Sequence, residues 1–322
     1  MAARETALNA LITCRRQSGW SNAVLKQTIA RDKLDSREAA LATRLCYGVV
    51  QNRGRLDFYL RQLLTGSLKK LHPAVRDILH MGLYQIYDMD KIPDSAAVNE
   101  SVTLARKYGA PGSDRLVNAV LRNAVRTKGT LQEPTSYEDR YSHPAELVSL
   151  LKTALPKGSL EGVLKANNEA PKTVIQVNTL KTTADALLEQ LRREGVEAEP
   201  HGWMPECLVL GSTGSLEKLP SFQQGLFYVQ DPASRLSVRC AGLQKGFRVL
   251  DCCAAPGGKS FAAAMAMEGR GSICSCDIHP HKIQLIENGA ARLGLGILQA
   301  RLQDASEFVP EWEGAMDAVL VD

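Results

Sequence analysis

The chain has 322 residues, of which 44% are apolar and 23% charged, a composition typical of a globular protein with more than one domain. A membrane helix needs about 18 consecutive apolar residues, and all apolar runs of this sequence are shorter, so we expect no membrane partner. The formal net charge of +4 is unevenly distributed, because residues 1–128 hold 21 Lys and Arg against 11 Asp and Glu, whereas the remainder holds 18 against 24. This division predicts a basic nucleic-acid-binding module joined to an acidic one.

The cellular compartment is indicated by the N-terminal residues and by the cysteines. Residues 1–17 place apolar side chains at helical spacing broken by charges, which is unlike a secretory signal. Eight cysteines are scattered without the spacing of a small disulfide scaffold. We therefore expect a cytoplasmic protein, and we expect it to be a monomer.

Residues 1–128 have the pattern of successive amphipathic helices. Asp35 and Glu38 have the spacing of a capping box at the start of one helix. Another helix begins at Pro73, and one of its faces collects the apolar side chains Val75, Ile78, Leu79, Leu83 and Ile86. In residues 114–126, apolar pairs leave the outer face to Arg115, Arg122 and Arg126, which join Lys69 and Lys70 as candidate RNA contacts. The sequence predicts an all-helical domain over residues 1–128.

A different organisation follows. Residues 129–170 are predicted as a linker and short helices, with residues 127–141 polar and without a period. Residues 171–231 are predicted as a small α/β module, whose helix is capped by Thr182 or Thr183 and ends at Gly195. Its short strands are expected in the segments TVIQVN, VEAEP, CLVL and LFYVQD.

Residues 232–322 form the last predicted domain, and from Phe247 strands and helices alternate. Strands are expected in FRVLDCC, GSICSCD, GILQARLQD and DAVLVD, with helices in KSFAAAMAM and KIQLIENGAARLG. Alternating strands and helices predict a parallel, doubly wound sheet.

The segment VLDCCAAPGGKS, residues 249–260, stands where the first strand meets the first helix. A Walker phosphate loop requires a glycine five positions before Gly258, but that position is Cys253. The segment also lacks the G-x-G-x-x-G pattern of a nicotinamide site. Neither of these sites is therefore predicted.

The thiols of this region allow two other interpretations. Cys252, Cys253, Cys274 and Cys276 could bind a metal together with His279 and His281, but a buried strand favours core thiols and surface histidines, so no metal is expected. A nucleophilic Cys252 or Cys253 near a helix N-terminus remains an alternative, although no base stands at a recognisable spacing.

A nucleotide-like cofactor fits the pattern best. In a doubly wound sheet, ligands bind beyond the carboxyl ends of the strands, beside the first strand–helix turn. Asp277 stands about twenty residues after Gly257 at the end of the second strand, which is the usual place of an acceptor for ribose hydroxyls. Asp304 and Asp322 end the next two strands, so we expect three acids along one crevice.

These segments, together with DIHPHK, LQDAS and DAVLVD, resemble the cofactor half of the bacterial RNA 5-methylcytosine methyltransferases, and most closely the RsmB (Sun/Fmu) family. In that family a NusB-like helical RNA-binding domain comes first, to which IPDSAAVNESVTLARKYG is similar, and a small RRM-like module follows, to which VNTLKTT and GLFYVQDPAS are similar. The resemblance implies a Rossmann-like methyltransferase sheet, S-adenosylmethionine as cofactor and methylation of a cytosine C5 in 16S ribosomal RNA.

The resemblance also implies roles for single residues. Cys253, Ala254, Ala255, Pro256, Gly257, Gly258 and Lys259 would form the turn that holds S-adenosylmethionine. Asp277 would bind its ribose hydroxyls, Asp304 would lie near the adenine, and Asp322 would lie near the methyl donor and the target base.

In that family, the two cysteines that take part in the reaction come after the segment that ends here at Asp322. Cys252 and Cys253 would not replace them. We therefore expect an incomplete sheet with an exposed apolar edge, and a chain that is inactive by itself. Two alternatives remain: methylation of a cytosine in another RNA, or a non-catalytic NusB-like RNA-binding factor of the antitermination type.

Overall fold

The computed structural model describes residues 2–17, 21–211 and 214–322. The chain divides into two units, Met1–Glu169 and Ala170–Asp322. In the described ranges, every helix is too short or too polar to cross a membrane.

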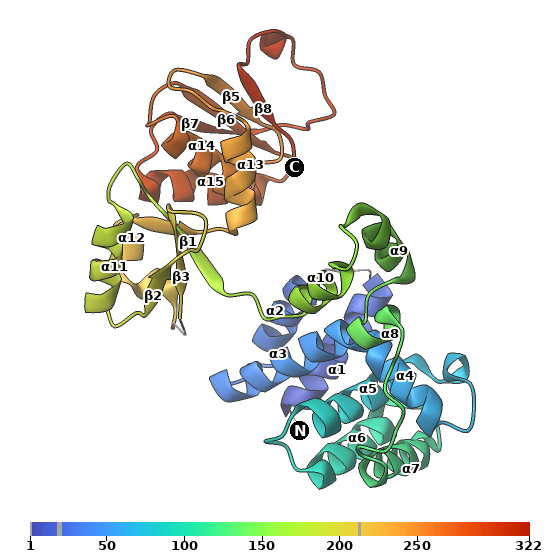
Figure 1. The fold of residues 1–322 in the computed structure, drawn as a ribbon. Coiled ribbons are helices and arrows are strands. Elements are labelled where there is room, and N and C mark those ends of the chain that lie inside the picture. Colours follow the sequence, from blue (N-terminus) through green and yellow to red (C-terminus); the bar gives the residue numbers. More distant parts are fainter. Residues whose placement is uncertain (1, 18–20, 212–213) are drawn as a thin grey trace. The chain divides into compact units, whose positions relative to one another are not determined.

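The first unit is built from helices, coloured blue to green in Figure 1. They pack around one apolar core that includes Leu8, Leu45, Leu60, Ile78 and Leu121. Their bounds are α1 (Ala2–Gln17), α2 (Ser21–Arg31), α3 (Ser36–Gln51), α4 (Arg53–Leu63), the 3₁₀ turn η1 (Leu68–Lys70), α5 (Pro73–Asp88), α6 (Asp94–Tyr108) and α7 (Ser113–Arg126).

Local signals in the sequence account for several of these helices. Pro73 is in the first turn of α5, and all five apolar residues of its predicted inner face are buried. Asp35 caps α3 by accepting a hydrogen bond from the Glu38 amide at 2.8 Å. The Glu38 carboxylate, however, does not complete the expected capping box. It accepts the Ala3 amide at 2.7 Å and so connects α3 to α1.

Residues 127–141 are more ordered than a linker without a period. Ser136 caps a short helix, α8 (Tyr137–Tyr141), by accepting the Asp139 amide at 3.2 Å. The following helices, α9 (Ala145–Ala154) and α10 (Leu160–Asn167), pack through Val148, Leu160 and Leu164. The helix α8 was missed because its stability comes from one cap and from contacts with α4, which leave no apolar period in the sequence.

The second unit begins with a small antiparallel sheet in the order β2-β3-β1-β4. Thr183 caps the helix that follows β1, accepting the Ala186 amide at 3.3 Å, which settles the choice between Thr182 and Thr183. The elements are β1 (Thr173–Val177), α11 (Ala184–Arg193), β2 (Ala198–Pro200), β3 (Cys207–Leu210), the 3₁₀ turn η2 (Leu216–Lys218), α12 (Pro220–Gln223) and β4 (Phe227–Val229).

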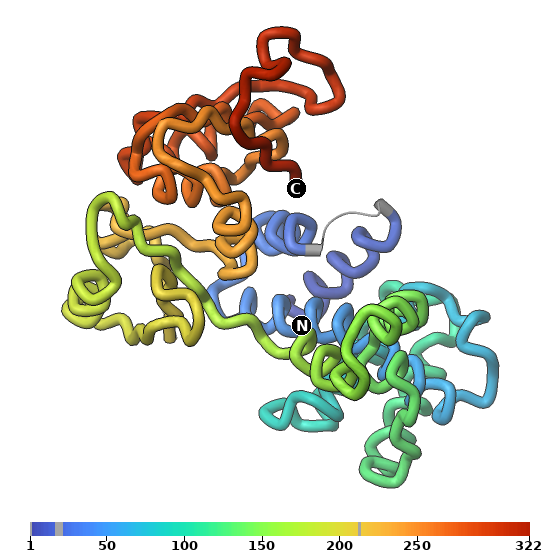
Figure 2. The backbone as a smooth tube through the Cα atoms, turned by 45° about the horizontal axis from the view of Figure 1, so that its top comes forward, coloured from blue at the N-terminus to red at the C-terminus, as the bar shows by residue number. Residues whose placement is uncertain are grey.

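A parallel sheet follows, in the order β7-β6-β5-β8. Its core joins Val249 and Ile273 of the strands to Phe261 and Ile286 of the helices. Residues 303–317 connect β7 to β8 and form the long loop at the top of Figure 2. The elements are α13 (Pro232–Cys240), β5 (Arg248–Asp251), α14 (Gly258–Ala266), β6 (Ser272–Asp277), α15 (Pro280–Leu293), β7 (Leu298–Leu302), the 3₁₀ turn η3 (Pro310–Trp312) and β8 (Ala318–Leu320).

The sheet therefore has the predicted parallel strands in the predicted chain order. In the described part of the chain, β8 lies at one edge, and its Val319 side chain is 53% exposed. The helix α13 was not predicted; Asp231 caps it by accepting the Ala233 amide at 2.7 Å.

Candidate functional site

The order of the parallel strands defines where a ligand can bind. The strand β5 lies between β6, which follows it in sequence, and β8, which is reached only after β7. The chain thus leaves β5 on one side and returns on the other, so the strand order reverses between β5 and β8. In open α/β sheets the crevice beyond the carboxyl ends at such a reversal is the usual ligand site.

The turn that follows β5 is tied to both neighbouring strands. The Cys252 amide donates to the Leu320 carbonyl of β8 at 2.9 Å, and the Ala254 amide donates to the Cys276 carbonyl of β6 at 2.7 Å. Within the turn, the Gly257 amide donates to the Ala254 carbonyl at 2.7 Å, and the Ala255–Pro256 peptide is cis. The predicted cofactor turn is therefore fixed to the carboxyl ends of the strands on both sides of β5.

The two glycines of the turn permit close packing at the start of α14. Gly257 has a φ of +106°, and a Cβ there would lie 2.4 Å from Cζ of Phe261. The first hydrogen bond of the helix runs from the Phe261 amide to the Gly257 carbonyl at 2.8 Å. The amides of residues 258–260 thus precede the helical hydrogen-bond ladder, and such amides form the positive end of a helix dipole, which favours an anionic group.

The predicted acids follow the carboxyl ends of their strands. Asp277 is buried at the end of β6, where it accepts the His279 amide at 3.0 Å and lies 3.6 Å from Nζ of Lys282. Asp304 follows β7, and hydrogen bonds from the hydroxyl and amide of Ser306 lower the pKa of its carboxyl. Asp322 follows β8, and its carboxylate lies 2.5 Å from Nζ of Lys259 in the turn.

Sequence reasoning missed a fourth acid, Asp251, which ends β5. Asp251 is almost fully buried and accepts a hydrogen bond from Oγ of Ser260 at 2.7 Å. Ser260 in turn accepts one from Oγ of Ser275 at 2.7 Å. Burial raises the pKa of Asp251. Ser275 in the strand predicted to be buried was the available signal, because a buried hydroxyl requires a partner.

The thiols of this region do not form a metal centre with the histidines. Sγ of Cys274 and Sγ of Cys276 lie 3.7 Å apart on β6, and the contact with Cys276 lowers the pKa of Cys274. Burial raises the pKa of Cys252. His279 and His281 are exposed, and among the described residues no three Cys, His, Asp or Glu side chains are placed to hold a metal ion.

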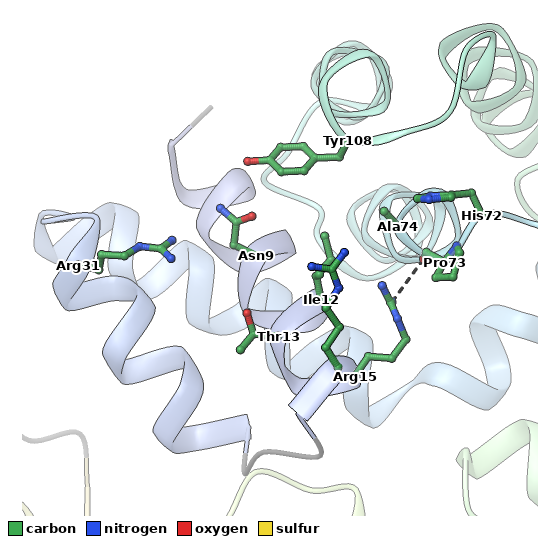
Figure 3. Close-up of a pocket in the computed structure, with 10 residues that line it drawn as sticks. Asn9, Ile12, Thr13, Arg15, Arg31, His72, Pro73, Ala74 and Tyr108 are labelled. Carbon is green, nitrogen blue, oxygen red and sulfur yellow. Dashed lines mark hydrogen bonds between the residues drawn. The ribbon is translucent and has the colours of Figure 1, made fainter.

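A basic cavity of about 490 Å³ lies in the first unit, between α1, the end of α2, the start of α5 and the end of α6 (Figure 3). Its lining includes Arg15, Arg16, Arg31 and His72 but no carboxylate. Arg15 pairs with Asp77 and donates to the Pro73 carbonyl at 3.4 Å, and Arg31 pairs with Asp32. In the described ranges Arg16 forms no ion pair, so it leaves an uncompensated positive charge at the cavity.

The candidate RNA contacts that were predicted from charge lie elsewhere. All five side chains are exposed, and none of them lines this cavity: Arg115, Arg122, Arg126, Lys69 and Lys70.

Comparison with known proteins covers most of the chain. Residues 1–126 match the NusB family, residues 143–217 match the ferredoxin-like domain of RsmF/B-like methyltransferases, and residues 241–322 match the 16S rRNA methyltransferase RsmB/F family. The probable ribosomal RNA small subunit methyltransferase B of Bacillus subtilis is 35% identical over 325 residues, which cover 99% of this chain and 72% of that protein.

The chain belongs to the RsmB/F family of 16S rRNA methyltransferases. A second member of this family, the probable ribosomal RNA small subunit methyltransferase B of Synechocystis, is 31% identical and covers 92% of the chain and 68% of that protein. The crystal structure of PH0851 shares the fold with a TM-score of 0.72 at 20% identity, over 98% of this chain and 73% of that one. The resemblance found in the sequence to the RsmB family is therefore confirmed, as are the helical NusB-like domain, the small α/β domain and the parallel methyltransferase sheet.

Proposed function

We propose that this member of the RsmB/F family methylates C5 of a cytosine in 16S ribosomal RNA and that S-adenosylmethionine is the methyl donor. The observation that carries the proposal is the reversal of strand order between β5 and β8, where the turn of residues 253–259 and three acids follow the carboxyl ends of strands in one sheet.

The groups at this edge suit the chemistry of the cofactor. Asp277 would offer a carboxylate to the two ribose hydroxyls, and Asp304, which follows the neighbouring strand β7, would lie near the adenine. The amides at the start of α14 suit the carboxylate of the methionine part, with Cys253 to Lys259 as the supporting turn. When bound there, S-adenosylmethionine supplies an electrophilic methyl group, and Asp322 would lie near that group and the incoming base.

Cytosine C5 becomes a sufficient nucleophile when a thiolate adds to C6, and a base must later remove the C5 proton. Cys253 begins the cofactor turn and Cys252 directly precedes it, and burial raises the pKa of Cys252. We therefore do not propose either of them as the attacking thiol. The target base must leave its stack to reach this edge.

The NusB-like domain is proposed to hold the RNA through its phosphates. The cavity supports this role through Arg16, because a guanidinium group forms paired hydrogen bonds with phosphate oxygens, whereas Arg15 and Arg31 are already paired with carboxylates. Exposed Arg115, Arg122, Arg126, Lys69 and Lys70 would add attraction without sequence preference.

The test is a map of 5-methylcytosine in the 16S rRNA of the source organism with and without the gene. We expect one modified cytosine to disappear when the gene is deleted, to return with an intact copy, and to stay absent with a copy carrying Asp277→Ala. An unchanged 16S map would refute the proposal. In that case a lost modification in another RNA would indicate a different substrate, and no loss anywhere would indicate an RNA-binding protein without this activity.

A further inference from the structure

A buried chain of hydrogen bonds lies beneath the proposed cofactor turn. Oγ of Ser275 donates to Oγ of Ser260 at 2.7 Å, and Oγ of Ser260 donates to Oδ2 of Asp251 at 2.7 Å. Both serines are fully buried and Asp251 is 1% exposed. Because Asp251 belongs to β5, Ser260 to α14 and Ser275 to β6, the chain links the three elements that surround the turn.

Asp251 is joined to both ends of the turn. It stands two residues before Cys253, the first residue of the turn, and its carboxylate accepts the hydroxyl of Ser260. Ser260 lies in the first turn of α14, directly after Lys259. The side chain of Asp251 therefore links the strand before the segment 253–259 to the helix residue that follows it.

Stability alone gives no reason to keep an acid at this position. Burial raises the pKa of Asp251, and the charged groups that face it are Lys259, which favours the ionised form, and Asp322, which opposes it. An acid whose pKa is higher in the folded state binds protons more tightly when folded, so its ionisation at neutral pH lowers the free energy of unfolding. A neutral side chain of the same shape would remove this cost.

We propose that Asp251, Ser260 and Ser275 are positioning residues for the cofactor: the ionised carboxylate, held through both serines, fixes the main chain of residues 253–259 in the conformation that binds S-adenosylmethionine. The inference rests on the proposed function, since it concerns how that same site is held. None of the three side chains needs to touch the cofactor, because each acts through the main chain of the turn.

An asparagine at position 251 separates this role from simple packing. Asparagine has nearly the same volume as aspartate but no charge, and a hydroxyl bonds less strongly to a neutral acceptor than to a carboxylate. In Asp251→Asn the link to Ser260 is therefore weaker, while the core around the side chain keeps its shape and the cost of burying a charge is removed. We expect a looser turn in a protein that is no less stable.

The experiment is calorimetric titration of the 322-residue chain with S-adenosylmethionine at neutral pH, together with the melting temperature of each variant. We expect Asp251→Asn and Ser260→Ala to bind about tenfold more weakly, the scale of one lost hydrogen bond to a charged group. The matched control is Ser221→Ala, because Ser221 is also fully buried and donates to a carboxylate, that of Glu194, at 2.6 Å, but lies in the β1–β4 module. The control is expected to lose stability and to keep its affinity.

Measuring the affinity at several pH values adds a result that a change in packing alone would not alter. The affinity of the unmodified chain should fall as the pH is lowered into the raised titration range of Asp251, and Asp251→Asn should lack this component. The inference is overturned if Asp251→Asn binds like the unmodified chain, or if Ser221→Ala weakens binding as much as Ser260→Ala does. If the folded, unmodified chain binds no S-adenosylmethionine, the proposed cofactor itself is wrong, and the inference fails with it.

Discussion

The ring of Phe261 lies directly against the main chain of Gly257, so that Cζ of the ring is 2.4 Å from the place of a Cβ on that glycine. Gly289 of α15 also packs against this ring, and a Cβ there would lie 2.4 Å from the same Cζ. Phe261 is buried and makes an edge-to-face contact with Tyr228 at 5.6 Å between centroids. The ring can therefore not give way to a larger residue in the turn.

From this contact we expect Gly257→Ala to disrupt the cofactor turn. The methyl group would strain a backbone with a φ of +106° and collide with the ring, which together should cost about 2–4 kcal/mol of stability. Binding of S-adenosylmethionine should weaken at least about tenfold. Gly246→Ala is the control, because Gly246 has a φ of +89° but open space around its Cβ position. Equal losses of affinity in both variants, measured by titration, would contradict a specific role for the contact.

Asp277 and Asp317 offer a comparison between the two ends of the sheet. Asp277 follows the carboxyl end of β6, whereas Asp317 precedes β8 and accepts the Arg248 amide at 2.7 Å at the opposite end. We expect Asp277→Asn to weaken binding of S-adenosylmethionine by about tenfold or more, because a ribose hydroxyl loses a charged acceptor. Asp317→Asn should bind normally. Competition with adenosine can show which part of the cofactor is affected, and equal affinities of the two variants would count against the assignment of Asp277.

Arg16 tests the proposed RNA contact in the helical unit. Replacing the unpaired Arg16 by alanine should weaken binding of a 16S rRNA transcript and reduce the slope of log affinity against log salt by about one, as for the loss of one phosphate contact. The control is Arg31→Ala, since Arg31 lines the same cavity but is already paired with Asp32. A salt slope unchanged by Arg16→Ala would show that this cavity does not hold a phosphate.

The hydrogen bonds of Asp57 indicate how the stability of the first unit depends on pH. Burial alone would raise the pKa of Asp57, but hydrogen bonds from His80 and Arg76 outweigh it and hold the pKa below its ordinary value. The stabilisation is therefore present above the unfolded pKa of about 3.9 and is lost as the pH falls below it. Urea titrations at several pH values should show this loss of stability. Asp57→Asn should abolish the pH dependence and lower the free energy of unfolding by about 3 kcal/mol at neutral pH. Asp114→Asn, at an exposed ion pair, should have little effect.

The sequence predicted those features that depend on local periodicity. The inner face of α5 follows from apolar spacing alone, and the positions of Asp277 and Asp304 follow from the fact that parallel strands end at the same edge. The chain of Asp251, Ser260 and Ser275 could not be predicted in this way, because its hydrogen bonds join three elements whose packing is set by the whole sheet.

The basic cavity escaped prediction for a related reason. Counting charges favoured the regular outer row of Arg115, Arg122 and Arg126 on α7, whereas the cavity collects Arg16 and Arg31 from different helices. Only the packing of these helices brings the two side chains to one place. The helix α13 was missed because Asp231 and Pro232 resemble a turn, although they cap and begin a helix.

The most direct test of the proposed site is a crystal structure of the chain with S-adenosylmethionine or its non-reactive analogue sinefungin. We expect the ribose hydroxyls within hydrogen-bonding distance of Asp277 and the amino-acid carboxylate at the amides that begin α14. A ligand bound away from the carboxyl ends of β5, β6 and β8 would contradict the proposed site.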